Sequence, residues 1–202
     1  MNIHEYQAKR ILSRYGVGAP RGAVAYTPEE AEKVARDLAA SGYVVKAQIL
    51  AGDRGPAGGV KMVSSPADVR EAASRMLGTE LATTQTGVRG DKVTRVYVEE
   101  ACDVARELYV GMIVDRASAR VALIFSREGG TDIEVQVAKR PDTVDRLAID
   151  PEEGLSSAAA RQVAGKLGLE GAAAEAGEHL LLGVYEAFTN LDASLVELNP
   201  LG

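Results

Sequence analysis

The chain of 202 residues has one cysteine, no tryptophan and few other aromatic residues. Its single cysteine, Cys102, excludes an internal disulfide framework and is typical of a reducing compartment. No apolar run approaches the roughly 20 residues that a membrane-spanning helix needs. The first ten residues, MNIHEYQAKR, are polar from the second position and do not resemble a secretory signal. These absences predict a cytoplasmic protein that has no contact with a membrane.

An excess of positive charge is also absent. The chain has 23 Lys and Arg against 29 Asp and Glu, which gives a net charge of −6. An acidic chain with few aromatic side chains for base stacking is not expected to bind nucleic acid in general. Its 46% apolar and 26% charged residues are ordinary for a globular protein with a real core. We therefore expect a protein that acts on a small molecule or on another protein.

Hydrophobic periodicity and capping signals predict a mixture of helices and strands. Three segments combine a capping side chain, a proline and an acid, which is a helix-start pattern: Thr27-Pro28-Glu29-Glu30, Ser65-Pro66-Ala67-Asp68 and Asp150-Pro151-Glu152-Glu153. Helices are expected over 2–15, 28–40, 66–77 and the alanine-rich stretch 156–189, which is interrupted near Gly168 and Gly171. Strands are expected at 22–26, 43–49, 59–63, 92–100, 108–115, 120–126, 133–139 and 193–200.

This order of elements predicts an α+β fold of two lobes. Residues 1–91 alternate strands and helices, whereas residues 92–202 are rich in strands. The runs 108–115 and 120–126 are separated by only four residues, which predicts an antiparallel hairpin.

A glycine-rich loop, AGDRGPAGG at 51–59, separates two predicted strands, and four of its nine residues are glycine. Lys46, Arg54 and Lys61 surround one acid, Asp53, so this segment has a local charge of +2. Glycines let backbone N–H groups approach an anion closely, and the charge favours phosphate. No Gly-Lys-Ser/Thr follows, which excludes a P-loop. A plain flexible turn remains the alternative, although Lys46 lies inside a strand, where a lysine usually needs a reason.

Acidic residues lie at the end of one predicted strand and the start of the next. Glu99 and Glu100 end the segment VYVEE, and Glu107 precedes LYVG. A strand end of this kind can contact a nucleotide base through its backbone and the ribose hydroxyls through a carboxylate. A solvated acidic turn is the alternative, and the sequence pattern alone favours it.

The last predicted strand carries Glu197 and Asn199, two residues apart and therefore on one face. A carboxylate and an amide oxygen placed in this way could bind a magnesium–phosphate group. Asn199 precedes a proline, however, and such a pair is most often a turn signal. His4 and His179 have no partner at metal-ligand spacing and are expected to be structural, and Cys102, with no His nearby in sequence, is expected to be unreactive.

Several segments together resemble the beta subunit of succinate–CoA ligase, and the related malate–CoA ligase fits equally well. The resemblance rests on MNIHEYQAK, the glycine loop with its flanking strands, VYVEE followed by ELYVG, the EGG at 128–130, and LVELNPL. It implies an ATP-grasp fold, in which two α/β lobes bind a nucleotide between them. It also implies a C-terminal flavodoxin-like domain, which these 202 residues do not contain. The 202 residues alone are therefore not expected to complete the ligase reaction.

The same resemblance implies a reaction, a partner and a set of site residues. ATP phosphorylates a histidine of an alpha subunit, the phosphate then activates a dicarboxylate, and coenzyme A, used only by the full heteromeric enzyme, captures the acyl group. Phosphoryl transfer of this kind depends mostly on positioning and charge neutralisation. The implied residues are Lys46, Asp53, Arg54 and Gly55 at the phosphates, Glu99 and Cys102 at the base, Glu107 at the ribose, Asn199 at Mg²⁺, and Glu197, catalytic with Arg54, facing the phosphohistidine.

Two residues of the loop depart from the family pattern, which has glycine at position 53 and lysine at 56. Aspartate tolerates left-handed backbone angles. The Asp53 carboxylate would repel a triphosphate, however, unless it points outward or pairs with Arg54 or Mg²⁺. Pro56 removes a backbone donor and stiffens the loop. Two alternatives stay open: another ATP-grasp acyl-CoA synthetase, such as a citrate-specific relative, and a nucleotide-binding or assembly module without ligase activity.

Overall fold

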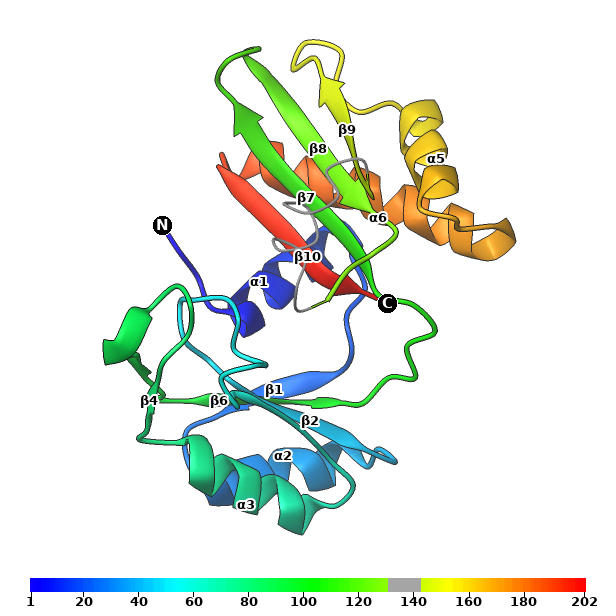
Figure 1. The fold of residues 1–202 in the computed structure, drawn as a ribbon. Coiled ribbons are helices and arrows are strands. Elements are labelled where there is room, and N and C mark those ends of the chain that lie inside the picture. Colours follow the sequence, from blue (N-terminus) through cyan, green and yellow to red (C-terminus); the bar gives the residue numbers. More distant parts are fainter. Residues whose placement is uncertain (131–142) are drawn as a thin grey trace. The chain divides into compact units, whose positions relative to one another are not determined.

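The computed structural model describes residues 1–130 and 143–202, which form two compact units (Figure 1). Unit 1 contains residues 1–10 and 19–103, and unit 2 contains residues 11–18 and 104–202. The first helix, α1 (Glu5–Leu12), begins in unit 1 and ends in unit 2. The structure thus divides the chain after Asp103, whereas the sequence pattern predicts a boundary near residue 92.

The difference in the boundary arises from one strand, β6 (Val96–Glu100). This strand pairs on one side with β1 (Gly22–Ala25) and on the other with β2 (Tyr43–Ala47). It is therefore a central strand of the first sheet and cannot belong to the second lobe. Such long-range pairing is not visible in the local pattern of residues 92–100.

Unit 1 is a four-stranded antiparallel sheet with two helices on one face. Its strand order is β1-β6-β2-β3, with β3 (Val60–Val63) at the edge beside β2. Helices α2 (Pro28–Leu38) and α3 (Pro66–Met76) pack against each other and cover the face formed by alternate strand residues. The fully buried members of this core include Ala25, Ala31, Ala35, Val45, Ala47, Val69, Ala73, Val93, Val96 and Val98.

Two of the three predicted helix starts are confirmed in unit 1. The Thr27 hydroxyl accepts a hydrogen bond from the Glu30 backbone N–H at 3.1 Å. The Ser65 hydroxyl accepts one from the Asp68 N–H at 3.2 Å. Proline follows each cap at the first helical position, where its missing N–H has no partner to lose.

Unit 2 is a second four-stranded antiparallel sheet, with strand order β10-β7-β8-β9. Strands β7 (Leu108–Asp115) and β8 (Arg120–Ser126) form the predicted hairpin, which closes with Asp115 opposite Arg120. Strand β10 (Leu195–Leu201) pairs with β7, and β9 (Val144–Ile149) pairs with β8.

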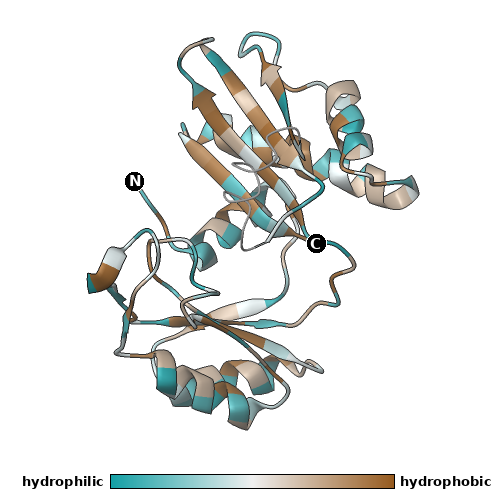
Figure 2. Cartoon of the chain, in the orientation of Figure 1, coloured by the Kyte–Doolittle hydropathy of each residue, from teal (hydrophilic) through white to brown (hydrophobic). Residues whose placement is uncertain are grey.

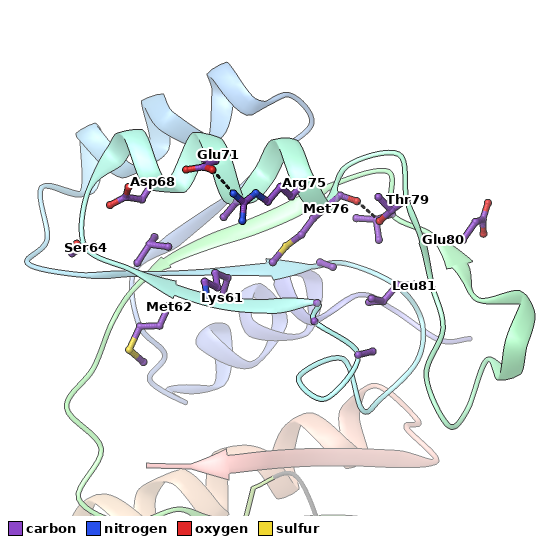
Figure 3. Close-up of a pocket in the computed structure, with 17 residues that line it drawn as sticks. Lys61, Met62, Ser64, Asp68, Glu71, Arg75, Met76, Thr79, Glu80 and Leu81 are labelled. Atoms are coloured by element: carbon purple, nitrogen blue, oxygen red, sulfur yellow. Dashed lines mark hydrogen bonds and ion pairs between the residues drawn. The ribbon is translucent and has the colours of Figure 1, made fainter.

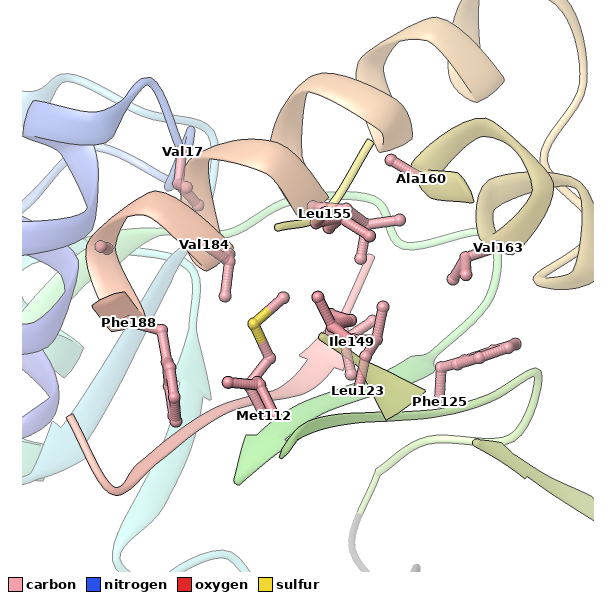
Figure 4. Packing of buried hydrophobic residues seen from close by; sticks show 14 of the residues in the cluster. Val17, Met112, Leu123, Phe125, Ile149, Leu155, Ala160, Val163, Val184 and Phe188 are labelled. Atoms are coloured by element: carbon pink, nitrogen blue, oxygen red, sulfur yellow. The ribbon is translucent and has the colours of Figure 1, made fainter. Parts of the chain in front are cut away.

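One face of this second sheet packs against two helices, α5 (Ser157–Lys166) and α6 (Gly171–Asn190) (Figure 4). The break between them at Gly168 and Gly171 confirms the predicted interruption. The core side chains include Met112, Leu123, Phe125, Ile149, Val163, Leu181, Val184 and Phe188. Figure 2 shows the apolar residues concentrated on the strands, and polar residues on the outer surfaces of α2 and α3.

The third predicted helix start, at Asp150, is wrong. Residues 151–153 form a turn, because the Gly154 N–H donates to the Asp150 carbonyl oxygen at 2.8 Å and the Glu152 N–H donates to Asp150 Oδ1 at 3.0 Å. The helix begins instead at Ser157, where the Ser156 hydroxyl accepts from the Ala159 N–H.

Smaller elements were not predicted from the sequence. Strand β9 was missed because only its last residue, Ile149, is buried, so it has no alternating apolar pattern. The short elements β4 (Glu80–Leu81), β5 (Asp91–Lys92), η1 (Ser13–Tyr15) and η2 (Gly87–Arg89) were also missed. The strand predicted at 133–139 lies outside the described residues. Among the helices of the described ranges, none is both long and apolar enough to cross a bilayer.

Candidate functional site

Charged side chains gather on the face of the unit 1 sheet that α2 and α3 leave uncovered. In the antiparallel pairing of β2 with β6, Lys46 lies opposite Tyr97, and Val44 lies opposite Glu99. Residues directly opposite each other share a face, and so do residues two apart along a strand. Lys46, Tyr97 and Glu99 therefore lie on the face opposite the buried Val45 and Val98.

The first turns of α1 and the glycine loop complete this group. Glu5 Oε1 accepts from Lys46 Nζ at 3.1 Å and from Lys9 Nζ at 3.1 Å, and Glu5 Oε2 accepts from Arg54 Nη2 at 2.8 Å. The Glu99 carboxylate forms ion pairs with both Lys9 and Lys46. We call Glu5, Lys9, Lys46, Arg54 and Glu99 the Glu5 cluster. Three cations and two carboxylates give it a net charge of +1.

The cluster lies largely out of water, so its charges interact strongly. The side chain of Glu99 is 5% exposed, and those of Lys46 and Arg54 are 22% and 20% exposed. Burial alone would raise the pKa of Glu5, but Lys46, Arg54 and Lys9 together outweigh it and hold this pKa well below its usual range. Burial, followed by Glu99 and Glu5, raises the pKa of Tyr97 to about 12. Glu5 therefore stays ionised at neutral pH, and the Tyr97 hydroxyl stays protonated.

Two of the three cations that the sequence placed around the glycine loop come together in this cluster, Lys46 and Arg54. Lys61 does not join them. The local charge of +2 counted from the sequence is therefore incomplete, because Glu5 and Glu99 arrive from distant segments. Neither Glu5 nor Lys9 was singled out beforehand, although both lie in the MNIHEYQAK segment that carries part of the family resemblance.

The glycine loop is held by its own backbone and by residues 84 and 85. The Gly59 N–H donates to the Arg54 carbonyl oxygen at 2.7 Å, and the Gly52 N–H donates to Gln85 Oε1 at 2.9 Å. Asp53 has a left-handed φ of 55°, a conformation that aspartate tolerates better than most residues. Its carboxylate accepts a hydrogen bond from the Thr84 hydroxyl. The Asp53 carboxylate is thus held by Thr84 and not by Arg54. The sequence did not predict this contact, because the segment TTQT at 83–86 has no distinctive pattern.

We expect the cost of replacing Asp53 to depend on the backbone angle as well as on the lost hydrogen bond. Asp53→Ala removes the bond to Thr84 and forces alanine into a left-handed conformation, so it should cost about 1–2 kcal/mol of loop stability. Asp53→Gly loses the same bond but relieves the backbone, so its cost should stay below about 1 kcal/mol. Hydrogen exchange at the Gly58 and Gly59 amides measures both. Equal costs for the two variants would contradict a role for the backbone angle.

In unit 2, Asn199 and Glu107 meet at one end of the sheet, where Leu201 lies opposite Leu108. Asn199 Oδ1 accepts from the Gly130 N–H at 2.7 Å, and Asn199 Nδ2 donates to the Gly130 carbonyl oxygen at 2.9 Å. The Glu107 carbonyl oxygen accepts from the Gly129 N–H at 2.9 Å. Asn199 and Glu107 thus both fix the EGG turn at 128–130.

Gly130 cannot readily be another residue at this turn. Its φ is +93°, and a Cβ at this position would lie 2.2 Å from Glu107 Oε2. Glu197 lies on the same face of β10 as Asn199, since exposed and half-buried residues alternate from Leu195 to Asn199. That face is opposite the one whose residues Val196 and Leu198 pack on the core.

Two further predicted site residues, Glu99 and Cys102, lie near the end of β6. Cys102 is exposed in the segment that follows β6, next to Ala101, whose N–H donates to the Gly42 carbonyl oxygen at 2.9 Å. The Glu99 carboxylate forms ion pairs with Lys9 and Lys46. A hydrogen bond to a nucleotide base at this strand end would therefore have to come from the neighbouring backbone. Within the described ranges, no three His, Cys, Asp or Glu residues form a group that could hold a metal ion. Among the described residues Asn199 Oδ1 accepts one hydrogen bond, from Gly130, and a carbonyl oxygen can accept two.

A cavity of about 650 Å³ lies elsewhere in unit 1, between α3 and the edge strand β3 (Figure 3). Asp68, Glu71 and Arg75 line it from α3, and Lys61 and Met62 line it from β3. Glu71 and Arg75 form an ion pair within it. The end of the glycine loop, Ala57 to Gly59, lines it as well, but no residue with a proposed catalytic, nucleotide or metal role does, so the size of the cavity alone does not indicate the functional site.

Relatives of known function match the whole of this chain. It is 49% identical over 201 residues to the beta subunit of ADP-forming succinate–CoA ligase of Parvibaculum lavamentivorans, and 47% identical to that of Burkholderia thailandensis. Each alignment covers 100% of this chain and 52% of the relative, so the chain spans about half the length of these proteins. The resemblance stated from the sequence motifs is confirmed.

Solved structures confirm the expected fold. Acetyl-coenzyme A synthetase 1 of Ca. Korarchaeum cryptofilum matches with a TM-score of 0.74 and 22% identity, over 98% of this chain and 86% of that one. ATP citrate lyase of Methanothrix soehngenii matches with a TM-score of 0.71 and 22% identity, over 98% and 46% of the two chains. At this level of identity the likeness concerns the fold alone. The ATP-grasp domain profile matches residues 2–202, and the chain belongs to the ATP-grasp domain family.

Proposed function

We propose that this chain is the nucleotide-binding half of an ADP-forming succinate–CoA or malate–CoA ligase beta subunit. In this role it transfers a phosphoryl group between ATP and a histidine of an alpha subunit. The observation that carries the proposal is the similarity to succinate–CoA ligase beta subunits, which extends over the whole chain at 46–49% identity. A cytoplasmic location and the use of coenzyme A by the full heteromeric enzyme belong to the same proposal.

The Glu5 cluster has donors left over for phosphate oxygens. A lysine ammonium has three N–H donors, and Lys46 uses one for Glu5 and one for Glu99. An arginine guanidinium has five, and Arg54 uses one for Glu5 and one for the Ala47 carbonyl oxygen at 2.8 Å. One donor on Lys46 and three on Arg54 are therefore available, as far as the described residues go. With a net charge of +1, the cluster suits an anion, and Arg54 would stabilise charge on the group in transfer.

The proposed roles in unit 2 fit the side chains found there. Glu107 would accept hydrogen bonds from ribose hydroxyls, and Glu197 would face the phosphohistidine. Asn199 would offer Mg²⁺ the second lone pair of its amide oxygen, a hard ligand of the kind that Mg²⁺ prefers. The bound Mg²⁺–nucleotide supplies the phosphoryl group and neutralises part of its charge. Asp53, Gly55 and Cys102 complete the proposed set, at the phosphates and at the base.

Titration calorimetry with ATP and Mg²⁺ tests the nucleotide part of this proposal. The chain should release binding heat, and Arg54→Ala should weaken binding by about 10- to 100-fold, because hydrogen bonds to charged groups contribute about 1.5–3 kcal/mol. Arg75→Ala is the matched control, since Arg75 is 76% exposed and pairs only with Glu71 among the described residues. It should leave the affinity unchanged. Absence of heat with the unmodified chain would contradict nucleotide binding.

A further inference from the structure

We propose that Glu5 is a positioning residue, which holds Lys46 and Arg54 in place for the phosphates. This inference rests on the proposed function, because it concerns how the same cations are arranged. The family resemblance assigns no role to Glu5. Within the described residues, however, it is the side chain that contacts both proposed phosphate-binding cations, Lys46 through Oε1 and Arg54 through Oε2.

The two cations need a common anchor because they come from different kinds of structure. Lys46 lies in a paired strand, whose backbone is fixed on both sides by β3 and β6. Arg54 lies in a loop with four glycines, where the backbone alone restricts a long side chain little. The Arg54 guanidinium is tied at two points, to Glu5 and to the carbonyl oxygen of Ala47 at the end of β2. The bond to Ala47 alone would leave the guanidinium free to rotate about it, so its direction also depends on the bond to Glu5.

Glu5 is itself held rigidly. Gln48, which is 1% exposed, donates from Nε2 to Glu5 Oε2 at 3.3 Å and accepts from the Tyr6 N–H through Oε1 at 3.2 Å. The Lys9 ammonium, one turn further along α1, pairs with the Glu5 carboxylate and lies 5.2 Å from the Tyr97 ring centre. A carboxylate fixed from both sides is suited to orient its partners. It is poorly suited to swing away when a ligand arrives.

The alternative is that Glu5 merely competes with phosphate for the cations. The two hypotheses predict opposite changes in the affinity of the chain for an anion when Glu5 is replaced by glutamine. Glu5→Gln changes the charge of the cluster from +1 to +2, so simple competition predicts tighter binding of an anion. Positioning predicts weaker binding, because the amide replaces one acceptor oxygen with an NH₂ donor, which would face Lys46 and Lys9 in the place of Oε1 or Arg54 in the place of Oε2.

Calorimetric titration of the chain with Mg²⁺–ADP distinguishes positioning from competition. Glu5→Gln should weaken binding by tenfold or more despite the added positive charge. Glu5→Asp, which keeps both oxygens on a shorter stem, should recover part of that loss. Glu29→Gln is the matched control, since it makes the same charge change at a 65% exposed side chain of α2, which pairs with Arg70 of α3, and it should have no effect. Unchanged or tighter binding by Glu5→Gln would overturn the inference, whereas absence of binding by the unmodified chain would overturn the proposed function instead.

A second measurement tests Glu5 without any nucleotide. Trypsin cleaves after Arg54 only when the guanidinium leaves its anchors and enters the protease pocket. Glu5→Gln should therefore speed cleavage at Arg54–Gly55 several-fold relative to the unmodified chain and to Glu29→Gln. Cleavage after the exposed Arg116, in the β7–β8 turn of unit 2, serves as the internal reference. An unchanged ratio of the two cleavage rates would overturn the anchoring of Arg54 by Glu5, whatever the chain binds.

Discussion

Replacing Lys46 by methionine is expected to lower the free energy of unfolding of unit 1 by about 2–3 kcal/mol. Removing one partner of a buried ion pair usually costs about 3–5 kcal/mol, because it leaves a charge without compensation. Here Lys9 remains beside Glu99, so we expect a loss below that range. Glu99 cannot escape to water easily, because it is 4% exposed in the middle of the sheet. Hydrogen exchange at the Val45 and Val98 amides measures the stability of this unit by itself.

A second substitution should reverse much of this loss. Lys46→Met with Glu99→Leu removes the stranded carboxylate, and an apolar replacement of a buried ion pair is often neutral or stabilising. Lys33→Met is the matched control, since Lys33 pairs with Asp37 at 2.5 Å on the surface and is 75% exposed. It should change stability by less than about 0.5 kcal/mol. If the double variant proves less stable than Lys46→Met alone, the burial of Glu99 is not the cause.

The same ion pairs show where sequence reasoning stops. The unusual position of Lys46 inside a strand was visible in the sequence, and so was Arg54 inside the glycine loop. Glu5, in contrast, lies 41 residues before Lys46, and nothing in its own segment indicates the contact. A charge summed over one segment omits such partners. Lys46, Arg54 and Glu99 were thus named from the sequence, whereas Glu5 and the pairing of Glu99 with Lys46 needed the fold.

The predicted helix starts show that a local sequence pattern can also be ambiguous. The Thr27 and Ser65 patterns were read correctly, whereas the Asp150 pattern was not. Aspartate can cap a helix or accept from the N–H two residues later in a turn, and both use the same residue types. At Asp150 the turn is completed by Gly154, whose φ is 72°. That glycine, one residue beyond the motif, was the local signal that could have decided between the two.

Opposite effects are expected from one substitution at two helical glycines of unit 2. Glycine inside a helix usually costs about 1 kcal/mol relative to alanine. Gly165 in α5 is exposed, and a Cβ added there would meet no atom within 4 Å, so Gly165→Ala should stabilise the unit by about 0.5–1 kcal/mol. Gly183 in α6 differs, because a Cβ there would lie 2.3 Å from the Tyr15 carbonyl oxygen.

Gly183→Ala should therefore destabilise unit 2 by about 2–3 kcal/mol, despite its better helix propensity. The clashing atom is backbone, so it cannot rotate away as a side chain could, and either α6 or the η1 segment must move. Both segments pack into one core through Val17, Leu181 and Val184, so a shift of either also loosens apolar contacts. Urea unfolding followed by hydrogen exchange at the α6 amides measures the two variants side by side. Stabilisation by Gly183→Ala would mean that η1 yields freely, and that residues 11–18 are not a fixed part of the core of unit 2.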